Sequence, residues 1–123
     1  MKYGNKKTVV DGIEFDSKKE AKRYCELKML QRAGIIEELE LQKEFLLIPA
    51  QHEYYPRYSK AGKQLKDGCR CVERSCTYKA DFAYRQNGQI VVEDTKSKAT
   101  KTKDYIIKRK LMLWRFGIKI REI

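Results

Sequence analysis

Apolar residues recur along the chain with two spacings, one typical of strands and one typical of helices. Two short β-prone runs, residues 8–10 and 13–15, are separated by Asp11-Gly12, a dipeptide typical of a two-residue hairpin turn. A second turn of this kind is predicted at Asn87-Gly88, in the middle of a longer alternating run. We therefore expect a short hairpin near the N-terminus and a long hairpin over residues 71–96.

Helical spacing occurs in two segments. Residues 17–33 begin with Ser17, a suitable N-cap, and carry an apolar residue at every third position before Gly34. These positions are Ala21, Tyr24, Leu27 and Leu30. Residues 100–116 have Thr102 as N-cap and Gly117 as the stop. Their expected buried stripe is Ile107, Leu111 and Trp114.

The remaining segments complete the expected architecture. Residues 35–48 predict one or two strands with a buried end, and residues 118–123 predict a short final strand. Residues 50–70 hold Pro56, two glycines and many charges, so we expect an exposed loop or insertion there. The order of elements predicts a single domain over residues 1–123. Its class is α/β or α+β, a mixed β-sheet flanked by helices.

The net charge of the chain indicates which class of partner to expect. Among 123 residues there are 28 Lys and Arg against 17 Asp and Glu, a formal net charge of +11. Such an excess favours a polyanion, and nucleic acid is the first expectation, beside a basic soluble protein without such a partner. We find no run of roughly 18 apolar residues for a membrane span and no signal-peptide pattern, so we expect a cytoplasmic protein.

The long hairpin predicts a cluster of charged side chains. A two-residue turn at Asn87-Gly88 fixes a register in which Asp81 lies directly opposite Asp94. Opposed Cβ atoms are about 4.5–5.5 Å apart, where two carboxylates repel each other unless a cation offsets their charge. Lys96, two residues beyond Asp94, points to the same face. Two acids and an amine beside a divalent cation suit phosphodiester hydrolysis, because the cation acidifies water and the amine orients it.

Two other interpretations stay open at this point. A three-residue turn would put Asp81 and Asp94 out of register and leave an ordinary polar sheet face. Glu20, three residues after Ser17, fits a capping box, in which its carboxylate accepts a hydrogen bond from the backbone N–H of the cap residue. That role competes with cation binding, and we expect one of the two to dominate.

Two stretches resemble a known family. Residues 15–20, which end with Glu20 on the first helix, and Val92-Glu93-Asp94-Thr95-Lys96, which follows Asp81 on the preceding strand, resemble the PD-(D/E)XK nuclease superfamily. Within it they look like a group of small phage and prophage proteins known as a domain of unknown function. The resemblance covers most of the chain apart from about residues 50–70. Ala80 stands where the superfamily name has proline, and Asp94 stands where glutamate is commoner.

The resemblance implies a restriction-endonuclease-like αβββαβ core, preceded here by the N-terminal hairpin. It also implies an endonuclease that cleaves DNA with Mg²⁺ or Mn²⁺, with branched or recombination intermediates as substrates. By position, Asp81 and Asp94 would bind the metal, Glu20 would complete its shell or orient a water, and Lys96 would act on the attacking water. One chain holds one site, so cutting both strands at once would need a homodimer.

Basic residues gather around the predicted site. A solvated charge run is the alternative for any one of them, whereas phosphate contacts would make binding depend on salt. The expected DNA-binding residues are Lys19 on the first helix and, after Lys96, Lys98, Lys101, Lys103 and Lys108.

Three other functions stay open: a DNA-binding module with this fold and no activity, an RNA-processing nuclease, and a zinc-stabilised interaction protein. The last would use Cys69, Cys71, Cys76 and His52, although their spacing differs from the usual Cys-x₂-Cys pairs and independent thiols fit it better. Cys25 is expected to be a buried thiol of the first helix, and no disulfide is expected.

Overall fold

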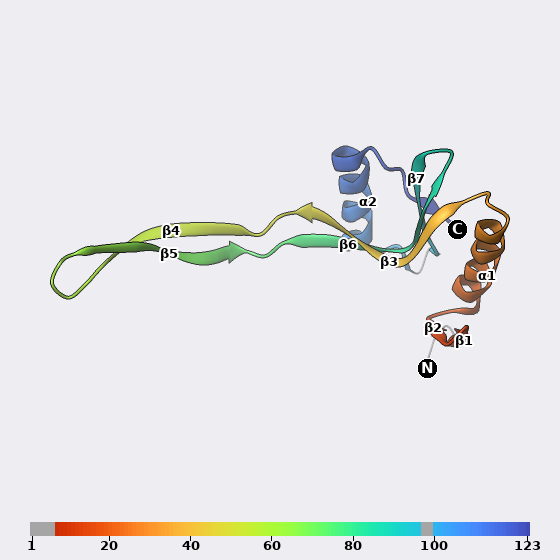
Figure 1. The fold of residues 1–123 in the computed structure, drawn as a ribbon, viewed down its shortest axis with the longest axis horizontal. Helices are drawn as coiled ribbons and strands as arrows, with labels where there is room; N and C mark the ends of the chain where they lie inside the picture. Colours follow the sequence, from red (N-terminus) through yellow and green to blue (C-terminus); the bar gives the residue numbers. More distant parts are fainter. Residues whose placement is uncertain (1–6, 97–99) are drawn as a thin grey trace.

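The computed structural model describes residues 7–96 and 100–123. A body of sheet and helices carries a long two-stranded arm (Figure 1). The elements are β1 (Thr8–Val10), β2 (Ile13–Phe15), α1 (Lys18–Arg32), β3 (Glu37–Ile48), β4 (Gln51–Tyr58), β5 (Gln64–Glu73), β6 (Cys76–Gln86), β7 (Gln89–Asp94), α2 (Lys103–Phe116) and β8 (Arg121–Glu122). The class is mixed α and β, as the apolar spacing predicts.

A four-stranded sheet with the strand order β3-β6-β7-β8 forms the centre of the body. β3, β6 and β7 are antiparallel neighbours, and β8 is parallel to β7. α1 and α2 lie on opposite sides of this sheet (Figure 1). The body therefore has three layers and two apolar clusters, one under each helix. Among the described residues, no helix is both long and apolar enough to cross a membrane.

The first helix forms as the sequence predicts. Ser17 is its N-cap, and its Oγ accepts a hydrogen bond from the Glu20 N–H at 3.1 Å. The predicted stripe of α1 packs against Phe82 and Tyr84 of β6. Cys25 lies off this stripe and is exposed, so the prediction of a buried thiol is wrong.

The second helix has the predicted ends but not the predicted buried face. Its N-cap is Thr102 and its C-cap is Gly117, at a φ of +68°. Its buried residues are Tyr105 and Met112, whereas Ile107 is 56% and Trp114 is 81% exposed. Leu111 packs at the margin of the core. Two apolar stripes run along this helix, and the tertiary fold decides which one meets the sheet.

Both predicted hairpin turns are present. Asp11 and Asn87 have φ values of +53° and +54°, and each is followed by a glycine with positive φ, as type I′ turns require. β6 and β7 pair from Gln86↔Gln89 to Phe82↔Glu93 in one unbroken register. The first strand of this hairpin begins at Cys76 rather than at residue 71.

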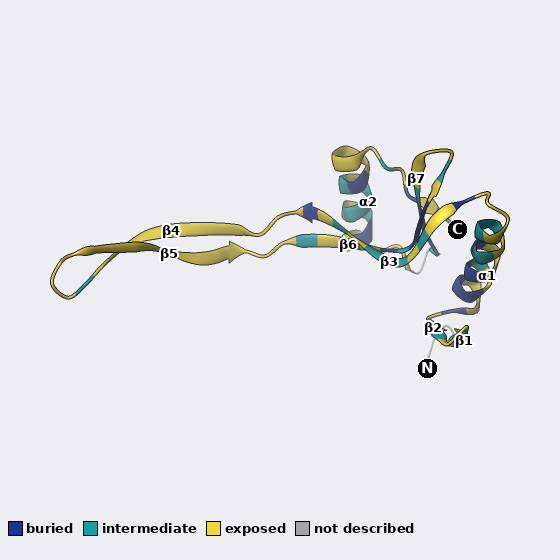
Figure 2. Ribbon diagram, viewed as in Figure 1, coloured by how far each residue is buried: buried dark blue, intermediate teal, exposed yellow. Residues whose placement is uncertain are grey.

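Residues 50–70 are not the irregular loop that their composition suggests. β4 and β5 pair with each other and continue β3 and β6, so the chain forms one long antiparallel ribbon (Figure 1). Pro56 is accommodated because it lies where the pairing of β4 and β5 is irregular, at the register shift between Tyr55 and Arg57. The ribbon is exposed along the arm (Figure 2). At the end of β3 only Leu47 is buried, so the expected burial of all of residues 45–48 is also wrong.

Candidate active site

Three acids and one lysine come together where β7 ends. Glu20 belongs to the first turn of α1, Asp81 to β6 and Asp94 to the end of β7, and Lys96 follows two residues later. The pairing of β6 and β7 reaches Phe82↔Glu93, one position before Asp81 and Asp94, and these two carboxyl groups lie close enough for each to shift the pKa of the other. The predicted two-residue turn is confirmed, and it brings the two acids together.

Asp94 is the most enclosed of the three acids, with 2% of its surface exposed. Its Oδ2 accepts a hydrogen bond from the Tyr78 hydroxyl at 2.6 Å and lies 3.5 Å from the Lys96 Nζ. The same ammonium group lies 4.5 Å from the ring centroid of Tyr105, a cation–π contact. Two tyrosines and a lysine thus fix the position of this carboxylate and of the amine beside it.

Asp81 is held by the residue after Asp94. Its Oδ2 accepts hydrogen bonds from the Thr95 backbone N–H at 2.9 Å and from the Thr95 hydroxyl at 2.7 Å. Because Thr95 directly follows β7, these bonds tie the end of that strand to the carboxylate on β6. Asp81 is partly exposed and is the most open of the three acids.

Glu20 divides its carboxylate between a local and a distant contact. Oε2 accepts a hydrogen bond from the Asp16 backbone N–H at 3.3 Å, one residue before the position that a capping box predicts. Oε1 accepts one from the Gln42 amide at 3.4 Å. Neither of these contacts is with the cap residue or with a cation, so which of the two roles dominates stays a prediction.

Gln42 connects two of the acids and was not predicted from the sequence. Its Nε2 lies 3.4 Å from Glu20 Oε1 and also 3.4 Å from Asp81 Oδ1. Its backbone has a φ of +53°, a left-handed conformation that is uncommon for a residue other than glycine. Strained backbone of this kind is frequent at functional sites. No local sequence pattern marks this kink, since the neighbouring residues simply alternate.

The facing strand is irregular at the same level. Ala80 packs in the cluster beneath α2, whereas Phe82, two residues later, packs in the cluster beneath α1. Regular alternation would place both on one face. Asp81 therefore lies where β6 changes face, opposite the left-handed kink of β3. The two irregularities let the two strands direct polar side chains toward Glu20.

Burial and mutual repulsion change the acidity of the three carboxyl groups. Burial, followed by the negative charge of Asp81, raises the pKa of Glu20 to about 7. Burial and the interaction with Asp81 raise the pKa of Asp94 to about 7, although Tyr78 and Lys96 oppose the shift. For Asp81, burial favours the protonated form, but hydrogen bonds from Asp94 and Thr95 outweigh it and lower the pKa. Near neutral pH the cluster thus retains protons that a bound cation would displace.

A pocket of about 250 Å³ lies beside the acids. Glu20, Gln42 and Asp81 line it together with residues 13–16 of the N-terminal hairpin and Leu41. The N-terminal hairpin therefore contributes to the site, a role that the sequence did not indicate.

The donor set fits a hard divalent cation. Mg²⁺ is usually held by one or two carboxylates and several waters, and the contact between Asp81 and Asp94 supplies two carboxylates. Within residues 7–96 and 100–123, no group of three or more His, Cys, Asp or Glu side chains is placed so that it could hold a metal ion.

The chain belongs to the DUF1064 family. The family model matches residues 1–122 and carries the description "Protein of unknown function". No curated protein and no solved structure matches the chain significantly. The DUF1064 description states no activity, so the resemblance to PD-(D/E)XK nucleases stays an expectation that rests on the residues themselves.

In this DUF1064 chain a third buried acid, Glu93, adjoins the site on the face of the sheet opposite Asp94. Glu93 is fully buried and accepts two hydrogen bonds from the Arg23 guanidinium, both at 2.7 Å. Tyr84 donates to the same carboxylate, and Arg121 lies 3.6 Å from it. Arg23 is three residues after Glu20, so this ion pair fixes α1 against the strand that ends in Asp94. Glu93 therefore positions the site without entering it, as strand alternation predicts.

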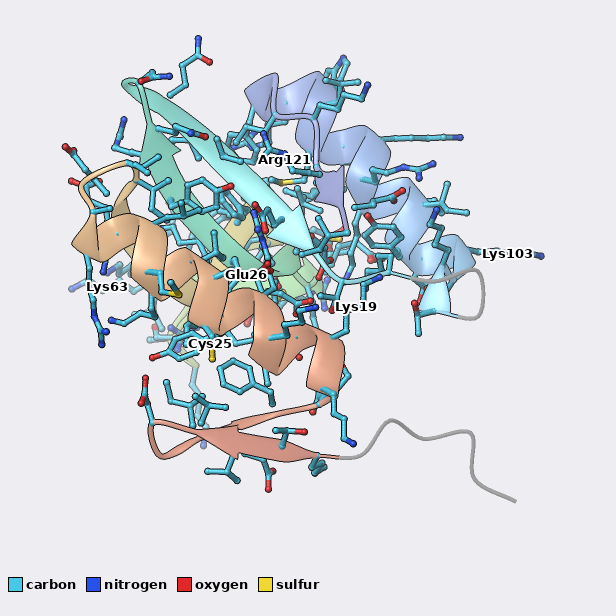
Figure 3. The ribbon with its side chains drawn as sticks, turned by 90° about the vertical axis from the view of Figure 1, so that its right-hand side faces the viewer. Lys19, Cys25, Glu26, Lys63, Lys103 and Arg121 are labelled. Atoms are coloured by element: carbon cyan, nitrogen blue, oxygen red, sulfur yellow. The ribbon has the colours of Figure 1, made fainter. Side chains whose placement is uncertain are left out.

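The predicted DNA-binding lysines lie in different surroundings. Lys19, on α1, and Lys103, at the start of α2, are exposed near the end of β7 (Figure 3). Lys101 forms an ion pair with Glu122 at 3.1 Å, and Lys108 is half-buried on α2. Lys98 lies outside the described residues.

The candidate zinc ligands of the DUF1064 chain lie on the ribbon. His52 pairs with Cys71 and Tyr54 pairs with Cys69 across β4 and β5, whereas Cys76 begins β6. All four cysteines, Cys25, Cys69, Cys71 and Cys76, are free thiols. The described residues include no metal-binding group of Cys and His, which leaves independent thiols as the better interpretation.

Proposed function

We propose that this protein is a metal-dependent endonuclease that hydrolyses DNA phosphodiester bonds. The observation that carries the proposal is the contact between Asp81 and Asp94, with the Lys96 ammonium 3.5 Å from Asp94. Two adjacent carboxyl groups in a partly buried site repel each other, and such an arrangement is typical of a site where a cation or a proton is handled.

Two further features support the same function. The net charge of +11 suits a polyanionic substrate. Apart from the two hairpins β1–β2 and β4–β5, the element order is helix, three strands, helix, strand, the order that the resemblance to PD-(D/E)XK nucleases implies.

Each residue then has a chemical role. Asp81 and Asp94 would hold Mg²⁺ or Mn²⁺, which would neutralise charge on the phosphate and acidify the attacking water. Lys96 orients that water and screens the phosphate charge. Tyr78 and Thr95 hold the two aspartates in place, and Gln42 links Asp81 to Glu20, which accepts hydrogen bonds at the margin of the site.

Cleavage of defined substrates tests this proposal. Supercoiled, linear and four-way-branched DNA would be incubated with the protein and Mg²⁺ or EDTA, beside Asp81→Asn and with excess RNA as competitor. We expect cleavage that needs Mg²⁺ and falls by about a hundredfold or more in the variant, the scale on which single charge-stabilising groups act. Binding of DNA without cleavage under both Mg²⁺ and Mn²⁺ would contradict the proposal. Inhibition of DNA cleavage by the RNA competitor would indicate an RNA substrate instead.

A further inference from the structure

The arm formed by β4 and β5 is the part of the molecule that the proposed chemistry does not use. All eight residues of β4 are exposed, and in β5 only Gly68 is buried. A two-stranded ribbon alone is at best marginally stable in water. The arm nevertheless extends far from the body as a paired two-stranded ribbon (Figure 1). Packing within this chain therefore does not explain why these residues form an extended arm.

One aromatic side chain packs tightly across the middle of the arm. The ring of Tyr55 lies directly over Gly68, where an added Cβ atom would be 2.2 Å from the Tyr55 Cζ. The Arg70 guanidinium lies 5.4 Å from the centroid of the same ring and forms an ion pair with Glu53 at 3.3 Å. The charges in the middle of the arm are thus partly paired.

The tip of the arm, residues 57–66, has a different composition. It carries Arg57, Lys60, Lys63 and Lys66 and no acidic residue. Within the described part of the chain, none of these four cations forms a salt bridge. The turn itself is ordered, because the Ser59 N–H donates to the Lys63 carbonyl oxygen at 2.8 Å. The arm therefore presents concentrated, unneutralised positive charge at its far end, next to a Tyr58 that is 61% exposed.

We propose that the tip of the arm binds the phosphate backbone of duplex DNA on one side of the cut. This inference rests on the proposed function for its substrate, and it adds a second contact remote from the acids. A two-stranded β-ribbon has the width that a DNA groove admits, and unpaired cations supply the phosphate contacts. A second copy of this chain is a poorer partner, because it carries the same charge of +11 and would repel the tip.

The ribbon sets the distance between the two contacts. β6 carries Asp81, and fifteen residues along the same side of the ribbon separate it from Lys66 in β5. At a rise of about 3.3 Å per residue the separation is at most about 50 Å. With about 3.4 Å per base pair, Lys66, the cation of the tip nearest the body, would meet DNA up to about 15 base pairs from the acids, and Lys60 and Lys63 would meet it farther out. A duplex too short to span this distance reaches the site but not the tip.

Duplex length and salt dependence test the inference. Binding of duplexes of about 12 and about 45 base pairs would be measured by fluorescence anisotropy over a range of KCl, without Mg²⁺ so that no strand is cut. The arm variant replaces Lys60, Lys63 and Lys66 by glutamine together. The matched control replaces three exposed cations of the body, Arg32, Lys110 and Lys119, by glutamine, which removes the same charge.

We expect the arm variant to bind the long duplex about tenfold or more weakly, with a salt slope smaller by roughly 3, and to bind the short duplex like the wild type. Equal losses in the arm and body variants, or equal losses for both lengths, would overturn the inference. So would a change of oligomeric state in the arm variant with unchanged DNA binding, which would assign the arm to a second copy. If the wild type cuts no DNA but the arm variant still loses binding to the long duplex, the result would support the arm contact and refute the proposed function.

Discussion

Charged residues of the body and of the arm stand in opposite environments. In the body, Glu20, Glu93 and Asp94 are at most 4% exposed, and no buried side-chain polar atom of the described residues lacks a hydrogen-bond partner. In the arm, every charged side chain is exposed. Burying an acid costs free energy that its partners must offset. The comparison indicates that the body gives up stability to hold acids in place, whereas the charges of the arm can change without loss of the fold.

The largest expected effect on folding concerns the buried ion pair behind the site. Arg23→Met leaves Glu93 buried without its bidentate partner, and we expect the free energy of unfolding in urea to fall by about 3 kcal/mol. The double variant Arg23→Met/Glu93→Met should recover much of that loss, because no charge is then left buried. A single variant as stable as the wild type would show that Tyr84 and Arg121 alone satisfy Glu93.

A smaller effect separates the backbone of Gln42 from its side chain. Both Gln42→Ala and Gln42→Gly remove the amide that joins Glu20 to Asp81, and we expect cleavage to fall about tenfold in each. Alanine must adopt the left-handed conformation with a Cβ atom, whereas glycine has none. We therefore expect the free energy of unfolding of Gln42→Ala to be about 1 kcal/mol lower than that of Gln42→Gly. Full activity in the glycine variant would mean that the amide does not position the acids.

The dependence of stability on pH follows from the raised pKa of Asp94. The folded protein keeps its proton up to about pH 7, whereas the unfolded chain releases it near its ordinary pKa of 3.8. Stability from this group is therefore complete below about pH 4 and is lost as the pH rises to 7. Asn resembles the protonated form, so Asp94→Asn should melt like the wild type at low pH and several degrees higher above pH 7. A constant difference between the two melting temperatures across this range would contradict the assignment.

The smallest effect is expected in the arm. Tyr55→Ser removes the ring that covers Gly68, yet the unfolding free energy of the body should change by no more than about 0.5 kcal/mol. Thermal unfolding and urea titration measure this change. A loss as large as that of Arg23→Met would show that arm and body fold as one unit.

The predictions from sequence succeeded where structure is local. Asn87-Gly88 fixes its own turn geometry, so the register that joins Asp81 to Asp94 could be derived without the fold. Ser17 and Thr102 likewise cap their helices through contacts three residues away. The coarse fold class followed from the same local patterns.

The failures concern contacts that only the tertiary fold decides. The left-handed backbone of Gln42 lies where its side chain contacts two acids, one from α1 and one from β6, that are distant in sequence. On α2, Ile107 and Trp114 form as good a stripe as Tyr105 and Met112, and the sheet selects the second. The arm was missed because it has no core, so its strands lack an alternating apolar pattern, and its proline, glycines and charges are typical of a loop.

The most direct measurement compares two neighbouring acids. Asp94 and Glu93 are adjacent and buried, but they point to opposite faces of the sheet. Plasmid cleavage with Mg²⁺ would be measured for Asp94→Asn and for Glu93→Gln, and normalised to the folded fraction of each. The account predicts that Asp94→Asn stays folded and loses cleavage, whereas Glu93→Gln loses stability and keeps most of its cleavage per folded molecule. Cleavage that survives Asp94→Asn but is abolished by Glu93→Gln would contradict the site described here.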